Sequence, residues 1–207
     1  MRIGIYGGTF DPPHIGHEYI LKEFIKQINL DKVYVMPTYI PPHKQVSTSV
    51  DPLTRLEMAK LAFEKISDKI IVSDLEIIRR GMSFTADTIS YFVDYGEKNE
   101  VFLLVGTDMF LTLSEWRRPF YIFNKSTIVH AKREEDKFFE EIIKEKIEDY
   151  QQGFNATITS LNINVIDVSS TQIRNKIKNN EDVSDLLSRE VIEFIQAKSL
   201  YKESGNG

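Results

Sequence analysis

Cysteine is absent from this sequence of 207 residues, and no apolar run is long enough to cross a lipid bilayer. The lack of cysteine excludes disulfide bonds and any metal site that needs a thiolate ligand. The chain also starts directly with a strand-like segment, without the basic and apolar leader that directs secretion. We therefore expect a cytoplasmic protein that has no membrane partner.

Two nucleotide-binding patterns are missing as well: GxGxxG of dinucleotide-binding folds and GxxxxGK[ST] of P-loop enzymes. Their absence removes the main support for an NAD-dependent oxidoreductase or a P-loop NTPase. A net charge of −5 argues against broad binding to nucleic acid, and a small anionic substrate fits this charge better. The length predicts one compact domain over residues 1–202, followed by a disordered tail over residues 203–207.

Short apolar segments alternate with amphipathic helical patterns along most of the chain. Ile20, Phe24 and Ile28 share one helical face, and a second helix starts at Asp51-Pro52. The apolar segments predict strands at residues 2–6, 32–36, 69–73, 100–105, 126–130 and 162–166. This alternation predicts an α/β fold, a Rossmann-like and mostly parallel sheet with helices on both faces and ligands at the carboxyl ends of the strands.

Two further helices are predicted in the second half of the chain. Residues 132–150 are rich in charge but keep helical spacing of apolar residues, which predicts an amphipathic helix with a solvated outer face. A loop over residues 151–155 is expected to follow it. Leu187, Val191 and Ile195 lie on one helical face and predict a short C-terminal helical cap.

The densest functional signal is Gly7-Gly-Thr-Phe-Asp-Pro-Pro-His-Ile-Gly-His17, directly after the first strand. The glycine pair allows a close backbone turn, and His14 and His17 stand three residues apart where a helix begins. Amide N–H groups at a helix start bind anions, so the pattern is typical of a triphosphate site. Taken singly, the glycines also fit an ordinary tight turn, and each histidine also fits a surface or core position.

A pair of histidines with HxxH spacing also occurs in metal sites. Here no cysteine can join His14 and His17, and neither His43 nor His130 has ligand-like spacing. We therefore expect no metal ion held by protein ligands.

Two cations lie in segments that suit phosphate binding. Lys44 follows Pro41-Pro42-His43 in a long, proline-stiffened loop, and loops of this length often carry function. Arg174 lies three residues after Thr171, in a segment that follows the sixth strand and opens a helix. By themselves, Lys44 also fits an exposed loop position and Ser169 an ordinary helix N-cap.

The first motif resembles the GxFDPxHxGH signature of the nucleotidyltransferase superfamily, and Ser169-Ser-Thr-Gln-Ile-Arg174 resembles its second signature, SSTxIR. Further stretches resemble the bacterial nicotinate-nucleotide adenylyltransferase family and extend the resemblance over nearly the whole chain. They are Pro41-Pro-His-Lys44, Gly81-Met-Ser-Phe-Thr-Ala-Asp-Thr88 and Gly106-Thr-Asp-Met-Phe-Leu-Thr-Leu-Ser-Glu-Trp116. The chain departs from the family pattern at Phe84, where relatives often have tyrosine, and at Ser114-Glu115, where many have proline.

The resemblance implies that the two ends of the chain meet at one triphosphate, and that ATP and nicotinate mononucleotide react to give deamido-NAD and pyrophosphate. Its implied catalytic residues, which act on the phosphates during direct in-line attack, are His14, His17, Lys44 and Arg174. Mg²⁺ would be bound through the ATP phosphates. The implied ATP-binding residues are Gly7, Gly8, Thr9, Phe10, Gly106, Asp108, Ser169, Ser170 and Thr171. Thr85 and Trp116 would bind nicotinate mononucleotide, with the indole stacked on the pyridine ring.

Other functions fit parts of the same pattern. A sister transferase would act on nicotinamide mononucleotide or on phosphopantetheine, although phosphopantetheine enzymes are shorter and lack the stretches around Thr85 and Trp116. A noncatalytic nucleotide sensor would keep the fold without turnover, but the presence of His14, His17, Lys44 and Arg174 argues against it. The sequence leaves a homo-oligomer open.

Overall fold

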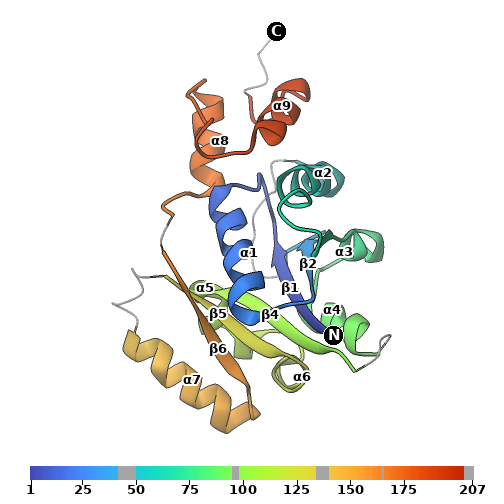
Figure 1. The fold of residues 1–207 in the computed structure, drawn as a ribbon, viewed down its shortest axis with the longest axis vertical. Helices are drawn as coiled ribbons and strands as arrows, with labels where there is room; N and C mark the ends of the chain where they lie inside the picture. Colours follow the sequence, from blue (N-terminus) through green and yellow to red (C-terminus); the bar gives the residue numbers. More distant parts are fainter. Residues whose placement is uncertain (42–49, 95–97, 134–139, 165, 203–207) are drawn as a thin grey trace.

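A six-stranded parallel sheet forms the centre of the protein in this computed structural model, and helices cover both of its faces (Figure 1). The structure describes residues 1–41, 50–94, 98–133, 140–164 and 166–202. The strand order is β3-β2-β1-β4-β5-β6, so the direction of the winding reverses between β1 and β4. This arrangement confirms the predicted α/β, Rossmann-like fold.

The strands are mostly buried, as expected for a parallel sheet covered on both faces. Their bounds are β1 Arg2–Gly8, β2 Lys32–Pro37, β3 Ile70–Val72, β4 Glu100–Gly106, β5 Thr127–Arg133 and β6 Ile158–Ile163. The first five lie close to their predicted positions, but the sixth was predicted too far along the chain. Leu161 and Ile163 are buried in the core, whereas Ile166 lies outside the core. The strand therefore ends at Ile163, earlier in the sequence than predicted. Val165 lies outside the described residues.

The helices connect successive strands and form the C-terminal end of the chain. Their bounds are α1 Ile15–Ile28, α2 Pro52–Phe63, α3 Leu75–Arg79, α4 Thr85–Asp94, α5 Thr107–Leu111, α6 Pro119–Lys125, α7 Glu140–Phe154, α8 Ser170–Lys178 and α9 Arg189–Ala197. A short 3-10 helix, η1, spans Leu113–Glu115. No helix among the described residues is long and apolar enough to cross a membrane.

Helix α7 differs from its prediction at both ends. Residues 132 and 133 belong to β5, and residues 134–139 lie outside the described part of the chain. At the other end, α7 continues through the predicted loop as far as Phe154. The ring of Phe154 packs against those of Phe123 and Phe120, each with centroids 4.7 Å apart. These aromatic contacts stabilise the last helical turn even though it contains Gly153.

Successive side chains of the sheet point into two separate cores. On β4, Phe102 and Leu104 join a cluster with α1, α2, α8 and α9, whereas Leu103 joins a second cluster with α4, α5, α6 and α7. The predicted C-terminal cap is confirmed, since Val191 and Ile195 on α9 are buried in the first cluster. This packing places α8 and α9 beyond the carboxyl ends of the strands (Figure 1).

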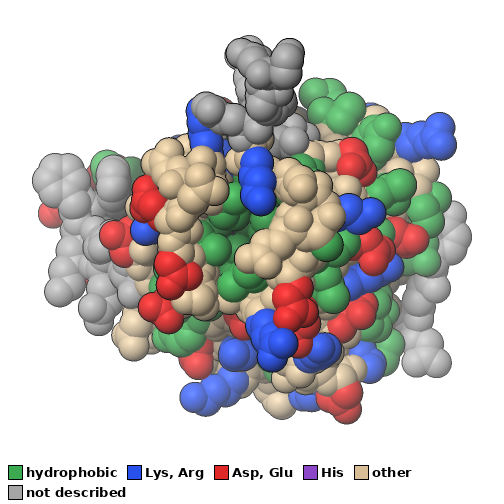
Figure 2. All heavy atoms as spheres, turned by 90° about the horizontal axis from the view of Figure 1, so that it is seen from above, with side chains coloured by type: hydrophobic (Ala, Val, Ile, Leu, Met, Phe, Trp, Pro, Cys, Tyr) green, Lys and Arg blue, Asp and Glu red, His purple; other side chains and the backbone are tan. Residues whose placement is uncertain are grey.

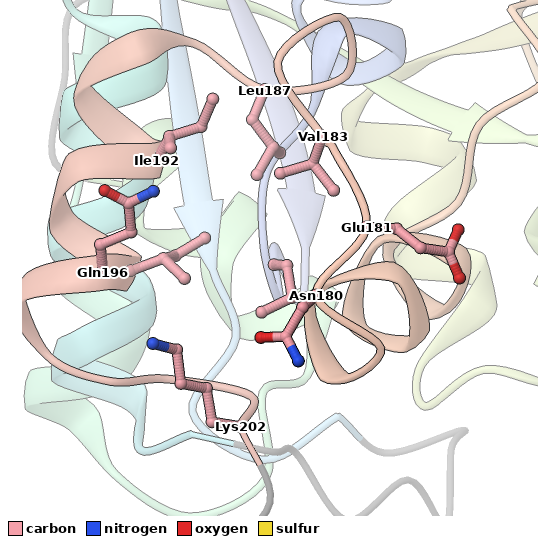
Figure 3. A pocket seen from close by; sticks show the side chains of 9 residues that line it. Asn180, Glu181, Val183, Leu187, Ile192, Gln196 and Lys202 are labelled. Atoms are coloured by element: carbon pink, nitrogen blue, oxygen red, sulfur yellow. The ribbon is translucent and has the colours of Figure 1, made fainter.

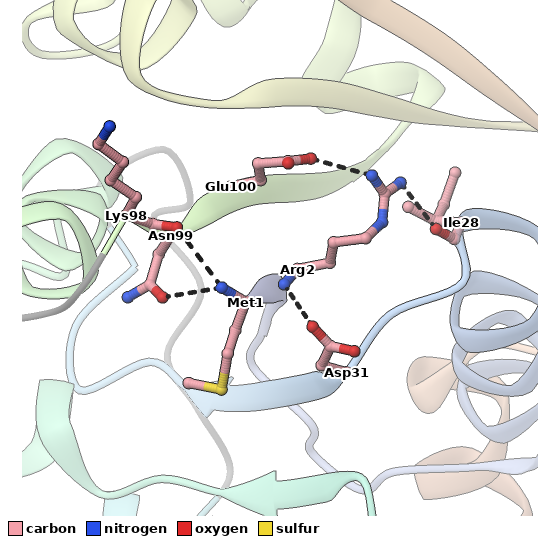
Figure 4. Close-up of polar contacts among 7 residues, drawn as sticks. All are labelled: Met1, Arg2, Ile28, Asp31, Lys98, Asn99 and Glu100. Atoms are coloured by element: carbon pink, nitrogen blue, oxygen red, sulfur yellow. Dashed lines mark hydrogen bonds and ion pairs between the residues drawn. The ribbon is translucent and has the colours of Figure 1, made fainter.

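Polar contacts of Arg2 fix the opposite, amino-terminal edge of the sheet (Figure 4). The Arg2 backbone N–H donates a hydrogen bond to the carboxylate of Asp31 at 2.8 Å. Its guanidinium donates to the Glu100 carboxylate and to the Ile28 carbonyl oxygen, both at 2.9 Å. The start of β1 is thereby joined to β4 and to the end of α1. The assignment of residues 1–202 to a single domain stays a prediction, and the predicted tail lies outside the described residues.

Candidate active site

The two central strands, β1 and β4, both end in glycines, and the winding of the sheet reverses between them. A Cβ atom added at Gly7 or at Gly106 would meet none of the described heavy atoms within 4 Å. Open space therefore lies at the carboxyl ends of both strands. This is the position at which open parallel α/β sheets bind their ligands.

The loop after β1 makes a tight turn beside this space. Phe10 has a left-handed backbone with a φ of 52°, and its ring is buried. A Cβ atom at Gly8 would lie 2.6 Å from the Phe10 ring, so glycine is required there. The Phe10 ring packs edge-on against Phe63 and His17, with centroids 5.3 and 5.2 Å apart. Any contact of Phe10 with ATP would therefore come from its backbone.

His14 and His17 lie at the start of α1, and their rings face each other. His14 is the buried N-cap residue, and its ring centroid lies 3.7 Å from that of His17. The His14 backbone N–H donates to Nδ1 of His17 at 3.2 Å. Because Nδ1 accepts this bond, a neutral His17 ring carries its proton on Nε2. The second histidine of the motif is thus a hydrogen-bond donor with a fixed orientation.

Gly16, between the two histidines, allows a close approach of the C-terminal segment. An added Cβ atom would lie 3.0 Å from Cγ1 of Val168 and 3.1 Å from Nδ1 of His14. Both distances are shorter than ordinary van der Waals contacts, so a larger residue would displace either the His14 ring or the segment before α8.

The two motifs predicted to converge do lie against each other. Ser170 at the start of α8 donates its hydroxyl to the carbonyl oxygen of Pro12 at 2.8 Å. The Arg174 guanidinium donates to the carbonyl oxygen of Asp11 at 2.7 Å and to the hydroxyl of Thr171 at 3.1 Å. Arg174 is therefore held across the gap between the loop after β1 and the first turn of α8.

Ser169 and Thr171 are exposed at this helix start. Ser169 is the N-cap of α8: its hydroxyl accepts a hydrogen bond from the Gln172 N–H at 3.2 Å, and the Gln172 side chain accepts one from the Ser169 N–H at 2.8 Å. This reciprocal pair is a capping box. The Ser170 bond to Pro12 places this amino-terminal end of α8 beside the loop that precedes α1.

A buried polar network contacts the loop after β1. The sequence analysis did not identify this network. The Arg55 guanidinium, fully buried, donates to the carbonyl oxygens of Thr9 at 2.8 Å and Thr38 at 2.6 Å. It thereby joins the loops after β1 and β2. The Tyr201 hydroxyl donates to the buried Asp11 carboxylate at 2.7 Å. Burial raises the pKa of Tyr201 and lowers that of Arg55, although Asp11 opposes the shift at Arg55.

Thr85 and Trp116 are the two residues that the family resemblance assigns to the second substrate. Thr85 is the first residue of α4, and Trp116 follows η1 and is half-buried. The Trp116 N–H donates to the Leu113 carbonyl oxygen at 3.3 Å. By contrast, the described residues provide no hydrogen-bond acceptor for the backbone N–H of Thr85 or of Arg117. The amide available near Trp116 is therefore that of Arg117.

A second buried network joins the segment before α4 to the loop after β2. The Tyr39 N–H donates to the Ser83 hydroxyl, and the Ser83 N–H donates to the Ile40 carbonyl oxygen, both at 2.9 Å. Beside them, the buried Glu76 carboxylate accepts a hydrogen bond from Thr88 at 2.7 Å. Burial raises the pKa of Glu76, and the hydrogen bonds from Thr88 and Ser83 partly oppose this shift. The motif around Thr85 contains Ser83 but gave it no role, and Glu76 lies outside the motif.

Two other predicted site residues are Asp108, which is exposed, and Lys44. Asp108 is exposed in the first turn of α5, which Gly106 precedes as N-cap. Lys44 lies outside the described residues. Among the described residues, no group of three or more histidine, aspartate and glutamate side chains is placed to hold a metal ion.

A different hollow lies at the C-terminal end of the molecule. Seen from above, hydrophobic side chains form the floor of a depression bordered by polar and charged side chains (Figure 2). A cavity of about 220 Å³ lies between α8 and α9, with Leu187, Val183 and Ile192 along it and Lys202 at one end (Figure 3). None of the predicted site residues lines this cavity.

Comparisons with known proteins identify relatives of the chain. The cytidylyltransferase-like family model matches residues 5–176. A protein of Fusobacterium nucleatum named "Probable nicotinate-nucleotide adenylyltransferase" is 37% identical over 197 residues, which cover 95% of this chain and 97% of that protein. A protein of the same name from Clostridium botulinum is 38% identical over 202 residues, 98% of each.

The fold also matches solved structures. The structure of Plasmodium falciparum nicotinic acid mononucleotide adenylyltransferase complexed with NaAD superposes with a TM-score of 0.73 at 20% sequence identity. The match covers 97% of each chain. At this identity the likeness concerns the fold.

Proposed function

The chain belongs to the nicotinate-nucleotide adenylyltransferase family, and from this premise we propose that it transfers the adenylyl group of ATP to nicotinate mononucleotide. The products are nicotinate adenine dinucleotide and pyrophosphate. A 5′-phosphate oxygen of the mononucleotide attacks the α-phosphorus and forms the new P–O bond. The bond from the α-phosphorus to the α–β bridging oxygen breaks, and pyrophosphate leaves with the electron pair.

In this proposal the enzyme acts by positioning and by charge stabilisation. The attacking phosphate is already ionised near neutral pH, so no histidine is needed as a general base. His17 would donate from Nε2 to the triphosphate, and the neighbouring His14 would contact it beside the start of α1. Arg174 would hold the phosphate tail from the C-terminal motif. Lys44 is proposed as a further phosphate cation on the grounds of sequence alone.

Magnesium is proposed as a further component of this site, bound through the ATP phosphates. When bound, Mg²⁺ would supply positive charge to the phosphate oxygens. It prefers oxygen ligands and usually keeps several waters, so it needs no cluster of protein ligands. In this proposal the ion would be held mainly by ATP phosphates and water.

The proposed acceptor site uses backbone donors. The N–H groups of Thr85 and Arg117 would bind the pyridine carboxylate, and the half-buried Trp116 indole would stack on the pyridine ring. A carboxamide would turn its NH₂ group towards the same donors and leave buried groups unpaired, at a cost of about 1–3 kcal/mol each. The acid is therefore the expected acceptor.

The observation that carries the proposal is the position of Arg174 across both motifs, with the paired histidines beside it. The test is incubation with ATP and nicotinate mononucleotide, followed by mass detection of the dinucleotide and assay of pyrophosphate. Equal amounts of the two products, with no adenylylated protein when ATP is present alone, support direct transfer. Detection of adenylylated protein would contradict direct attack, and a lack of dinucleotide would contradict the proposed function.

A further inference from the structure

A cation is fixed where the two segments of the proposed acceptor site meet. The Arg117 guanidinium lies over the Phe84 ring, 4.5 Å from its centroid. Nη1 of the same group lies 3.8 Å from Oδ2 of Asp87. Phe84 immediately precedes Thr85, and Arg117 immediately follows Trp116. The Arg117 side chain therefore joins the start of α4 to the segment after η1.

The charges of this cluster do not balance. Arg118 places Nη1 3.7 Å from Oδ1 of Asp87, so two guanidinium groups share one carboxylate. The Arg118 guanidinium lies over the Tyr121 ring, 4.2 Å from its centroid. The cluster of Asp87, Arg117 and Arg118 thus carries one excess positive charge, and Arg117 is the member stacked on the residue before Thr85.

Stacking on the Phe84 ring orients the positive charge of the half-exposed Arg117 side chain. A planar guanidinium over an aromatic face is held by cation–π attraction, which an ammonium group on a flexible stem reproduces less well. The adjacent backbone N–H groups of Thr85 and Arg117 add donors that have no acceptor among the described residues. Donors and an excess positive charge together favour a ligand with a carboxylate over a neutral one.

We propose that the Arg117 side chain determines acceptor specificity by selecting a carboxylate over a carboxamide on the pyridine ring. This inference rests on the proposed function, because it concerns the second substrate of that reaction. Asp87 opposes the selection, since it neutralises part of the positive charge. The two side chains should therefore change the preference in opposite directions.

The test measures kcat and KM for nicotinate mononucleotide and for its amide in three variants. Arg117→Gln should lower kcat/KM for the acid by roughly three- to tenfold, mainly through KM, and should change the value for the amide much less. Arg117→Lys should retain part of the preference. Asp87→Asn should raise the preference for the acid above that of the wild type. Arg189→Gln, which removes an exposed charge on α9, is the matched control and should change neither value.

Each alternative result overturns the inference. An equal loss of kcat/KM for both acceptors in Arg117→Gln would make Arg117 a structural support only. The same conclusion would follow if Asp87→Asn lowered the preference for the acid, as Arg117→Gln is expected to do. An unchanged preference in a folded Arg117→Gln variant would remove it from recognition. The proposed function is judged on the wild type alone: a preference of the wild type for the amide contradicts the function itself, whatever the variants do.

Discussion

Arg174 donates a hydrogen bond at 2.7 Å to the carbonyl oxygen of Asp11, a residue 163 positions earlier in the chain. The bond holds the first turn of α8 against the loop that precedes α1. The phosphate site that we propose depends on this contact, because it brings the cation of the C-terminal motif to the loop that leads into the two histidines.

Arg174→Lys should separate the charge of this residue from its geometry. Lysine keeps the positive charge, but its single ammonium group cannot reproduce the two bonds that Nη1 and Nη2 of Arg174 donate to the Asp11 carbonyl oxygen and the Thr171 hydroxyl. We expect kcat/KM for ATP to fall by about ten- to a hundredfold, with a smaller effect on the acceptor's KM. Steady-state kinetics with each substrate varied in turn measure this, with Arg189→Lys as the control. Full activity of Arg174→Lys would show that charge alone suffices.

His17→Ala should lower turnover by about two to four orders of magnitude, on the scale of losing a donor to the charge that develops in the transition state. ATP affinity should change much less, since backbone N–H groups remain at the start of α1. Turnover and equilibrium binding of ATP are measured on the same preparation. Lys22→Ala, at an exposed position of the same helix, is the control. Near-normal turnover in folded His17→Ala would exclude His17 from catalysis.

Gly16→Ala and Gly153→Ala form a matched pair. At Gly16 the new methyl group would lie 3.0 Å from Val168 and 3.1 Å from His14, so the free energy of unfolding should fall by about 1–3 kcal/mol and activity should fall with it. At Gly153, within α7, the methyl group meets no described atom within 4 Å, and stability should rise by about 0.5–1 kcal/mol. Denaturant unfolding and kcat/KM measure both. Equal effects of the two substitutions would contradict the close packing at Gly16.

Glu76 should make stability depend on pH. Burial raises its pKa above the ordinary value of 4.5, so the folded state binds the proton more tightly than the unfolded state does. The stabilisation from protonated Glu76 is therefore full below pH 4.5 and is lost as the pH rises through the raised pKa. In Glu76→Gln that loss should be absent. Unfolding free energies against pH test this, with exposed Glu57→Gln as control, and identical profiles for wild type and Glu76→Gln would contradict it.

The sequence predicted the features that depend on local pattern. Alternating strands and helices predicted the sheet, and the motif after the first strand predicted that a helix begins at His14 and His17. Where tertiary packing decides, the predictions were less accurate. Phe154 extends α7 through aromatic contacts with residues on α6, and Leu161 and Ile163 set the position of β6 through the core.

The supporting residues of the candidate site differ in how far the sequence signals them. Arg55 shares a helical face with Met58, Ala59 and Ala62, all of which are buried. An arginine on an apolar helical face could therefore have been recognised from the sequence as a buried, hydrogen-bonded residue. Tyr201 gives no local signal, because its partner Asp11 lies 190 positions away. Arg117 has the appearance of an ordinary surface charge until its position over Phe84 is known.

The most direct test of adenylyl transfer to the acid is a competition between the two acceptors. Wild-type enzyme is given ATP with equal concentrations of nicotinate mononucleotide and nicotinamide mononucleotide, and the two dinucleotide products are separated and counted at early times. We predict that the acid is preferred by at least roughly ten- to a hundredfold in kcat/KM, because its carboxylate accepts from the backbone donors at Thr85 and Arg117. Equal use of both acceptors, or preference for the amide, would contradict the account.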